Sequence, residues 1–371
     1  MLKIAHFTTV HKRSDVRIRY KQSISSSKHG DVVLVVADGM GSEGHQALNI
    51  VDLGYSSKKL INRVVFLYPR LIIYALTNNI NIAHIHDPEL IPFGWFLKLI
   101  NKKVIYDAHE DYPKQILHKD KFPFFVRKPI SLFIKMIEII SSRYIFDIIT
   151  VPSNHMLKRF EDYKKNVYEL YNYPLLSEFR RFKNISVEQR FNSIVYVGPI
   201  FRLRGIKEII TSLEYVQSPI VFDLAGAIAD QSYFEELKRL PGWRFVRYHG
   251  ILNRNQVCTL LQNSKIGVVA DYPVEHYMEA YSTKMFEYMA SGLALLLTDM
   301  PLHKNFLLNK DCGYVYKLFD KFDLANKIDI IVNNDVIFSR LSDASYNFST
   351  DYSWESQEYV MSRIYGQLTV N

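Results

Sequence analysis

The 371-residue chain is 48% apolar and 23% charged, a balance typical of a soluble globular protein with room for two domains. Two cysteines are too few for a disulfide framework, and the absence of any run of 18 uncharged apolar residues excludes a membrane span. The net charge of +8 belongs to residues 1–175, where 25 Lys and Arg face 16 Asp and Glu; because these charges are scattered, they favour an anionic substrate or membrane over nucleic acid.

Short apolar runs alternate with helical patterns along the first half of the chain, which indicates a parallel sheet covered by helices. The expected strands are 2–7, 32–37, 63–67, 82–85, 103–107 and 147–151. The expected helices are 15–29, 68–79, 90–101, 129–144 and 154–161. The apolar run at the N-terminus is too short for a signal peptide and is typical of a first strand.

A second series of strands and helices follows a polar, irregular stretch from Ser177 to Ser193, which is typical of a linker. The expected strands are 193–198, 219–225, 244–248, 265–270, 294–298 and 313–316. The expected helices are 205–215, 231–240, 255–263, 283–291, 321–333 and 335–345, with a closing helix from 352 to 368. We therefore expect two doubly wound α/β domains that face a cleft, residues 1–175 and 190–351.

Three polar segments follow expected strands of the first half. The loop His11-Lys-Arg-Ser-Asp-Val-Arg17 offers His11, Asp15 and Arg17, although a charged solvated turn explains it equally well. The segments 84–89 and 106–113 each combine histidine with carboxylates, residue types that serve as acid–base groups or metal ligands. Neither has the spacing of a zinc site, so no metal is expected. His84 and His86 share one strand face, where at least one is interpreted as a core histidine, and His109 with Glu110 is the better functional candidate.

Residues 122–146 combine many aromatic and aliphatic side chains with a basic flank that includes Lys135 and Arg143. Such a helix can lie on a membrane surface. An ordinary helix that faces the core is the preferred interpretation, and a lipid-linked substrate would favour the membrane instead.

The second half opens with Gly198, Arg202, Arg204, Gly205 and Lys207 in the first turn from strand to helix. Glycine allows close approach of a ligand to the backbone, and arginine suits phosphate oxygens. This turn holds phosphates in nucleotide-binding folds, although it has no G-x-G-x-x-G pattern and two surface arginines would explain it as well.

Glu279 and Glu287 stand eight residues apart around Ser282-Thr283-Lys284. Ser282 is a suitable N-cap and Gly292 a suitable C′ residue for a helix over 283–291. A helix start after a buried parallel strand is a site for anions, and Lys284 in the first turn is disfavoured unless an anion offsets it. A diphosphate at the helix start, with a carboxylate on each side for sugar hydroxyls, is one interpretation; a solvated amphipathic helix with incidental acids is the other.

Together these segments resemble the retaining glycosyltransferases of family 4, the group 1 enzymes with two Rossmann-like domains in the GT-B architecture. The resemblance rests on Glu279-x7-Glu287 followed by Tyr288-Met-Ala-Ser-Gly292, and on Tyr196-Val-Gly-x5-Arg204-Gly205. Tyr106-Asp-Ala-His-Glu110 and His11-x3-Asp15-x-Arg17 resemble a branch that assembles bacterial surface polysaccharides. Tyr352-Ser-Trp-Glu355 is similar to the family's closing helix, which implies that residues 352–371 cross back to the first domain.

The resemblance implies a nucleoside-diphosphate sugar in the second domain and a glycan acceptor in the first. Glu287 would hold the ribose and Glu279 the donor sugar, while Arg204 and the amides of Ser282–Lys284 would neutralise the diphosphate. His109 matches the family histidine near the reacting centre. The remaining expected donor contacts are Arg202, Lys207, Gly198, Thr283 and, near the base, Gly250. The expected acceptor contacts are His11, Asp15, Arg17 and Glu110.

Two positions depart from the family pattern. Pro199 replaces the family's first phosphate-binding arginine, so that either Arg202 substitutes for it or the contact is missing. The glycine-rich loop after the first strand is replaced by residues 11–17.

We thus expect a cytoplasmic, metal-independent enzyme without a cofactor that transfers sugar from a UDP- or GDP-sugar to a lipid-linked glycan for O-antigen, capsule or exopolysaccharide synthesis. Its partners would be the donor, the acceptor and, peripherally, an anionic membrane. The alternatives are a sugar-nucleotide epimerase or hydrolase of similar fold and a non-catalytic subunit that binds sugar nucleotides. The sequence gives neither the base, the sugar nor the linkage.

Overall fold

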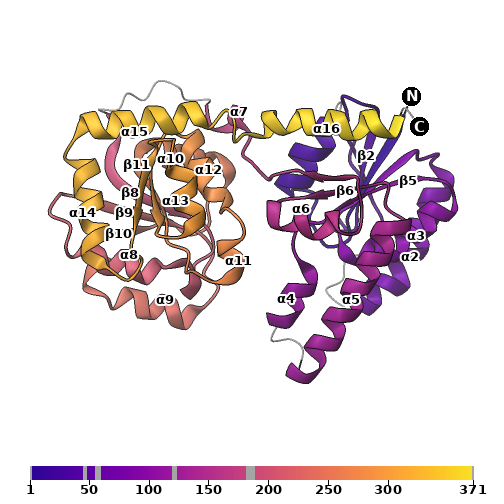
Figure 1. The fold of residues 1–371 in the computed structure, drawn as a ribbon, viewed down its shortest axis with the longest axis horizontal. Helices are drawn as coiled ribbons and strands as arrows, with labels where there is room; N and C mark the ends of the chain where they lie inside the picture. The colour runs from indigo at the N-terminus through magenta and orange to yellow at the C-terminus, as the bar shows by residue number, and fades with distance from the viewer. Residues whose placement is uncertain (1, 45–47, 55–59, 119–122, 181–188, 370–371) are drawn as a thin grey trace. The chain divides into compact units, whose positions relative to one another are not determined.

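The computed structural model describes residues 2–44, 48–54, 60–118, 123–180 and 189–369 (Figure 1). The chain forms two compact units: unit 1 comprises Met1–Asn172 with Gln357–Asn371, and unit 2 comprises Tyr173–Ser356. Each unit contains one parallel sheet covered by helices. The predicted class of two Rossmann-like domains is therefore confirmed. Part of the expected linker, residues 181–188, lies outside the described residues.

The sheet of unit 1 has seven parallel strands in the order β3-β2-β1-β4-β5-β6-β7. Their bounds are β1 (Lys3–Phe7), β2 (Asp31–Val36), β3 (Asn49–Asp52), β4 (Ile82–Ile85), β5 (Lys103–Asp107), β6 (Ile148–Val151) and β7 (Val167–Glu169). The helical segments are η1 (Val16–Ser23), α1 (Ile24–Ser26), α2 (Leu60–Thr77), η2 (Pro88–Leu90), α3 (Ile91–Leu99), α4 (Tyr112–His118), α5 (Phe124–Tyr144) and α6 (Asn154–Glu161).

The two faces of this sheet differ in chemistry. Alternate strand residues such as Phe7, Ile85 and Tyr106 join the apolar core under α2, α3 and α6. Because side chains alternate along a strand, His6, His84 and Asp107 point to the opposite face. That face is covered by η1, α1 and the closing helix α16 (Trp354–Thr369), since Ser26 of α1 contacts both His6 and Tyr365 of α16 (Figure 1).

Unit 2 has six parallel strands in the order β10-β9-β8-β11-β12-β13. Their bounds are β8 (Phe191–Val197), β9 (Val221–Ala225), β10 (Val246–Tyr248), β11 (Ser264–Val269), β12 (Ala294–Thr298) and β13 (Gly313–Tyr316). The helices are α7 (Leu176–Phe179), η4 (Arg202–Arg204), α8 (Ile206–Leu213), α9 (Gln231–Lys238), η5 (Pro241–Phe245), α10 (Arg254–Asn263), α11 (Glu275–Met278), α12 (Thr283–Ala290), α13 (Pro301–Leu307), α14 (Lys321–Val332) and α15 (Asp335–Phe348). Its core lies between this sheet and helices such as α8 and α14.

Two expectations about elements are wrong. The strand expected at 63–67 is part of α2, because Leu67, Leu71 and Ala75 are buried at a spacing of four residues while Val65 and Phe66 are exposed. The expected sheet also lacked β3 and β7, two short edge strands whose few residues give a weak periodic signal.

The preferred interpretation of residues 122–146 as a core-facing helix holds for only part of α5, where Ile137 packs against the apolar core of unit 1. The buried positions of α5 are polar: Ser131, Glu138, Ser141 and Ser142. Phe124 and Phe125 are 86% and 77% exposed, and Leu132, Phe133 and Met136 are exposed as well. This helix therefore also presents a set of apolar side chains outward.

Among the described residues, no helix combines the length and apolarity that crossing a bilayer requires. Residues of α16 from Gln357 onward belong to unit 1, whereas the chain before them belongs to unit 2. In unit 1, the side chains of Met361, Ile364 and Tyr365 are buried.

Candidate functional site

Glycines bring the loops after β8, β9 and β10 together at the carboxyl edge of the unit 2 sheet. The Gly198 amide donates to the Ala225 carbonyl over 2.9 Å, and the Gly226 amide donates to the Gly250 carbonyl over 2.8 Å. A Cβ on Gly226 would lie 1.8 Å from the Gly198 oxygen. The structure therefore places two predicted donor contacts, Gly198 and Gly250, on adjoining loops.

Arg204 lies at the end of η4, beside the end of β11. Its Nη1 donates to Asp271 Oδ1 over 2.8 Å, and its guanidinium lies over the Tyr277 ring. Gly205 follows with φ of 62°, and a Cβ there would lie 2.1 Å from the Ala270 oxygen. Only glycine lets the chain turn here, so Gly205 fixes the direction in which Arg204 leaves the loop.

Arg202 and Lys207 do not join Arg204. Each donates to a different oxygen of Glu236 on α9 over 2.7 Å, and the Arg202 side chain is 55% exposed. Their predicted place in the donor site is not supported by this geometry, because a carboxylate that neutralises both cations lies between them. Consequently, the substitution of Arg202 for the arginine missing at Pro199 is not seen.

Lys284 is a buried cation in the first turn of α12. Its Nζ lies 5.0 Å from the centre of the Tyr196 ring, and its alkyl chain passes beside Gly198. Burial, together with the charge of Arg204, lowers the pKa of Lys284 to about 8, although Asp271 opposes this shift. The site therefore holds two cations, Arg204 and Lys284, beside the carboxylate of Asp271, and the charge of Glu287 also acts on Lys284.

The start of α12 has the predicted boundary. Ser282 is the N-cap by backbone conformation, but no side chain caps the first amides of the helix. Thr283 is exposed, and Gly292 follows the helix with φ of 68°. The first amides of α12 therefore have no capping bond from the Ser282 side chain, and unpaired amides at a helix start can bind an anion.

The two glutamates differ in their surroundings. Glu287 Oε1 accepts from Arg254 Nη1 over 2.7 Å, and Arg254 Nε donates to Glu178 Oε2 over 2.7 Å. Glu279 is half-buried and directly follows α11. Arg254 therefore holds one oxygen of the Glu287 carboxylate in place.

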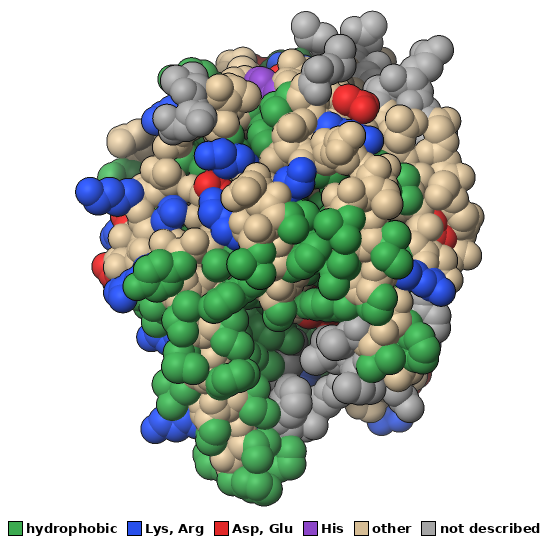
Figure 2. Space-filling view, turned by 90° about the vertical axis from the view of Figure 1, so that its right-hand side faces the viewer, with side chains coloured by type: hydrophobic (Ala, Val, Ile, Leu, Met, Phe, Trp, Pro, Cys, Tyr) green, Lys and Arg blue, Asp and Glu red, His purple; other side chains and the backbone are tan. Residues whose placement is uncertain are grey.

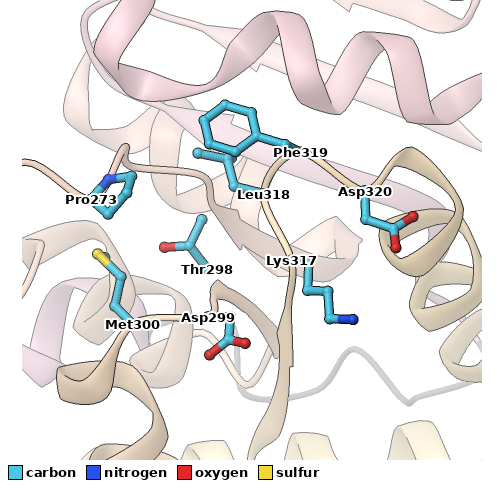
Figure 3. Close-up of a pocket in the computed structure, with 8 residues that line it drawn as sticks. All are labelled: Pro273, Thr298, Asp299, Met300, Lys317, Leu318, Phe319 and Asp320. Atoms are coloured by element: carbon cyan, nitrogen blue, oxygen red, sulfur yellow. The ribbon is translucent and has the colours of Figure 1, made fainter.

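A pocket of about 430 Å³ opens near the ends of β12 and β13 (Figure 3). Its lining residues are Pro273, Thr298, Asp299, Met300, Lys317, Leu318, Phe319 and Asp320. None of the predicted site residues lines it. It contributes no cluster of groups with a chemical task, so the candidate site rests on Arg204, Lys284 and the glycine loops instead.

In unit 1, Asp107 is the buried centre of a polar cluster at the end of β5. Arg17 pairs with both of its oxygens at 2.6 and 3.0 Å, while Gln22, Thr150 and His109 contact it at 2.7 to 2.8 Å. Burial acts to raise the pKa of this carboxyl, but Arg17 and His109 hold it well below its ordinary value. Asp107 is therefore a fixed anion.

His109 is partly exposed above this cluster. Its Nε2 lies 2.8 Å from Asp107 Oδ2, and its ring centre lies 5.0 Å from that of His11. Glu110 is exposed and accepts from the Gln115 side chain. The structure thus brings His109 and His11 together and leaves Glu110 outside the cluster.

The predicted acceptor contacts in the loop after β1 differ in their exposure and in their partners. His11 is half-exposed, lies 3.5 Å from Asp15 and 3.4 Å from Asp87, and its pKa is raised because these carboxylates outweigh its burial. Burial would raise the pKa of Asp15, but His11 and the Ile18 amide lower it to about 2. Arg17 is buried and forms an ion pair with Asp107, so it holds Asp107 in place instead of contacting an acceptor.

Among the described residues, two groups have the spacing of metal ligands: His6 with His84 and His86, and His86 with Asp107 and His109. In the first, the His84 ring lies 4.6 Å from the His6 ring at a tilt of 36° and is stacked on the His86 ring at 22°. In the second, Arg17 and Gln22 already donate to Asp107 Oδ2.

Sequence reasoning missed the partners that organise both clusters. Asp271 directly follows an expected strand, as Asp107 ends one, and that position was an available signal. Arg254, His6 and Gln22 offered no local signal, because each acts on a residue far away in the sequence.

The fold and the two sites can now be compared with known proteins. The whole chain is similar to sucrose-phosphate synthase from Thermosynechococcus elongatus, with a TM-score of 0.77, 15% identity and complete coverage of both chains. Anabaena HepE, solved with UDP-glucose, gives a TM-score of 0.69 at 11% identity over 99% of this chain and all of that one. WaaG, a glycosyltransferase involved in lipopolysaccharide biosynthesis, gives 0.68 at 12% identity over 98% of this chain and 99% of that one. The fold is that of the GT-B glycosyltransferases.

The sequence of unit 2 is similar to a known protein family. Residues 178–348 match the family described as glycosyl transferases group 1, and this stretch contains Arg204, Lys284 and both glutamates. A comparison with curated proteins found no match. Most of unit 2 is therefore similar in sequence to group 1 glycosyl transferases, and the whole chain has the GT-B fold.

Proposed function

We propose that this protein is a retaining, metal-independent glycosyltransferase of family 4 that transfers a sugar from a UDP- or GDP-sugar to a lipid-linked glycan. The observation that carries the proposal is the pair of cations, Arg204 and buried Lys284, beside the uncapped start of α12. Cations and helix amides at the carboxyl edge of a parallel sheet suit a diphosphate. The match of residues 178–348 to group 1 glycosyl transferases supports the same donor class.

Relatives of the same fold support the donor and the pathway. HepE was solved with UDP-glucose, and a trehalose-6-phosphate protein from E. coli was solved with UDP-2-fluoro glucose. WaaG takes part in lipopolysaccharide biosynthesis. These relatives favour a UDP-sugar as the first donor to test and a surface polysaccharide as the product.

The chemistry assigns a task to each group. The leaving diphosphate gains negative charge as the glycosidic bond to the donor breaks, and Arg204, Lys284 and the α12 amides stabilise it. Glu287 binds ribose hydroxyls, and Glu279 binds the donor sugar. His109, held on Asp107, contacts a hydroxyl near the reacting centre.

The experiment that tests this function is release of UDP or GDP from a panel of sugar nucleotides, with and without membrane extract as the acceptor source. Release that requires the extract and yields a glycoside supports transfer. Conversion of the sugar without extract would identify an epimerase or a hydrolase. Neither binding nor turnover with any donor would overturn the proposal.

Lys284 makes donor binding depend on pH. Its pKa is about 8 in the free protein, and a bound diphosphate raises it by placing anions beside the ammonium. Well below pH 8 the ammonium is already present, so Lys284 adds no pH dependence to the affinity for UDP. Above pH 8 binding takes up a proton, and affinity falls up to about tenfold per pH unit.

Isothermal titration of UDP at pH 7 and pH 9, in two buffers of different ionisation enthalpy, measures this uptake. The Lys284→Met variant is expected to lose it. The matched control is Lys207→Met, which removes a lysine held by Glu236 and keeps the uptake. Tight UDP binding by the wild-type protein without any proton uptake at pH 9 would contradict the assignment of Lys284.

A lipid-linked acceptor accounts for the outward face of α5. Its exposed Phe124, Phe125 and Phe133 lie on the same helix as exposed Lys128 and Lys135. Figure 2 shows hydrophobic side chains concentrated over the lower part of this face of unit 1. Aromatic side chains with lysines at their flank suit the interface of an anionic membrane. We therefore propose peripheral binding to the inner face of the cytoplasmic membrane through α5.

Phe124→Ser combined with Phe125→Ser is expected to weaken binding to vesicles that contain anionic lipid by at least tenfold, because two aromatic anchors are lost. Cosedimentation with anionic and with neutral vesicles measures this. Phe319→Ser removes a phenylalanine of unit 2 that is 71% exposed and leaves binding unchanged. Equal sedimentation of the wild-type protein and the double variant would refute the role of α5.

A further inference from the structure

The polar face of the unit 1 sheet contains a continuous chain of hydrogen bonds that leads to His109. Ser26 Oγ donates to the Gln22 carbonyl over 2.7 Å and lies 2.9 Å from His6 Nε2. His6 Nδ1 lies 3.0 Å from His86 Nε2. His86 Nδ1 then lies 3.3 Å from both Asp107 Oδ2 and His109 Nε2.

The rings of His6 and His86 are arranged for a hydrogen bond in their common plane. The two planes differ by 15°, and the ring centres lie 5.2 Å apart. His84 packs across this pair and takes no part in the chain, because neither of its ring nitrogens has a partner among the described residues.

Counting protons fixes the direction of the chain. A carbonyl oxygen at one end and a carboxylate at the other can only accept, so four contacts between Gln22 and Asp107 need four protons. Ser26 and two neutral imidazoles supply three. Burial keeps both rings neutral, since it lowers the pKa of His6 and of His86. One contact must therefore lack a proton.

The distances indicate which contact that is. They lengthen from 2.7 Å at Gln22 to 3.3 Å between His86 Nδ1 and Asp107. The missing proton belongs at the longest contact, where a lone pair faces the carboxylate. His6 and His86 then both carry their proton on Nε2, and His86 Nδ1 is an acceptor.

The neighbour that can donate to His86 Nδ1 is His109. Its Nε2 must carry a proton, because it lies 2.8 Å from the Asp107 carboxylate. That N–H therefore sits between two acceptors, Asp107 and His86. No hydrogen bond to His109 Nδ1 is found among the described residues, so this nitrogen is left for a ligand.

We propose that Ser26, His6 and His86 are positioning residues that hold His109 in the Nε2–H tautomer with Nδ1 presented to a hydroxyl of its ligand. The identity of that ligand rests on the proposed function, whereas the tautomers do not. Asp107 alone would fix one bond to the ring. The acceptor nitrogen of His86 adds a second hydrogen bond to the His109 ring. This second bond limits rotation of the ring about the bond to Asp107.

The test uses the full chain labelled with ¹⁵N in its histidine rings, in which NMR reports the protonated nitrogen of each ring. In the wild-type protein, His6, His86 and His109 are expected to carry the proton on Nε2. Ser26→Ala removes the link to Gln22. Two imidazole protons then suffice for the two remaining contacts, and the chain reverses so that His6 and His86 carry their protons on Nδ1.

Tyr365→Phe is the matched control. Tyr365 also bonds to Ser26, over 2.7 Å, but its loss leaves the contact from Ser26 to Gln22 and the tautomers unchanged. Protons on Nδ1 of His6 or His86 in the wild-type protein, or tautomers unaffected by Ser26→Ala, would overturn the proposal. These spectra need no enzymatic activity, so they remain decisive if no donor is ever turned over.

Where transfer is measured, Ser26→Ala is expected to lower kcat roughly tenfold with an unchanged KM for the donor. Tyr365→Phe is expected to stay within about twofold of the wild-type kcat, because it preserves the orienting bonds. A rise in donor KM with unchanged kcat would contradict positioning through His109.

Discussion

Arg204→Ala is expected to lower kcat/KM for sugar transfer roughly 100- to 1,000-fold, the effect of removing one group that stabilises a developing anion. Arg204 lies next to Lys284, and its charge is only partly offset by Asp271. The side chain is held between the Tyr277 and Phe201 rings, so the guanidinium is ordered before any ligand binds. Sugar-nucleotide turnover with the acceptor extract measures the loss.

Arg202→Ala is the control for this prediction. Arg202 lies two residues away and is also an arginine, but it is exposed and paired with Glu236, so its loss is expected to change kcat/KM less than about threefold. Removal of Arg204 also leaves Asp271 buried without its ion pair, so thermal unfolding of each variant is compared. Equal losses of activity in both variants at equal stability would contradict the assignment of Arg204.

The second large effect is expected for Asp107→Asn, which should lower the free energy of unfolding by roughly 3–5 kcal/mol, because it leaves the buried Arg17 charge uncompensated. The carboxylate also accepts from Gln22, Thr150 and His109, and an amide cannot accept from all of them. Denaturant unfolding measures the change. Activity should fall with it, because His109 loses the anion that orients it.

A double variant that replaces both Arg17 and Asp107 distinguishes the cost of an unpaired buried charge from the cost of altered packing. Arg17→Met with Asp107→Met removes both members of the pair and is expected to be more stable than Asp107→Asn alone.

The contribution of Asp107 to stability also has a defined pH dependence. Because its pKa is held well below 3.8, the stabilisation is complete above that pH and is lost only as pH falls toward the folded-state pKa. Full stability of Asp107→Asn at pH 7 would refute this account.

Local periodicity predicted most of the elements in both units. The strands at 82–85, 103–107, 294–298 and 313–316 agree with the structure residue for residue, because each is a short buried run between turn signals. The error at 63–67 has the opposite cause. A β-branched, apolar run looked like a strand, whereas a helical spacing that begins at Leu67 and extends to Ala75 decided the structure.

The predicted site residues divide according to how local their constraints are. Gly205, Ser282 and Gly292 were predictable because a turn or a helix end is decided by a few neighbouring residues. Arg202 and Arg204 look equivalent in the sequence. The carboxylate with which each one pairs determines whether its side chain lies in the candidate site. Glu236 holds the first, and Asp271 holds the second.

The sequence by itself determined the alternation of strands and helices, the two-domain α/β class and the helix start at Ser282, because hydrophobic spacing and capping act within a few residues. Only the tertiary structure decided which charges are neutralised and which remain for a ligand. Arg17 and Asp107 are 90 positions apart, and Arg204 and Asp271 are 67 apart. Electrostatic pairing and burial depend on distance in space, and the sheet topology alone brings these residues together.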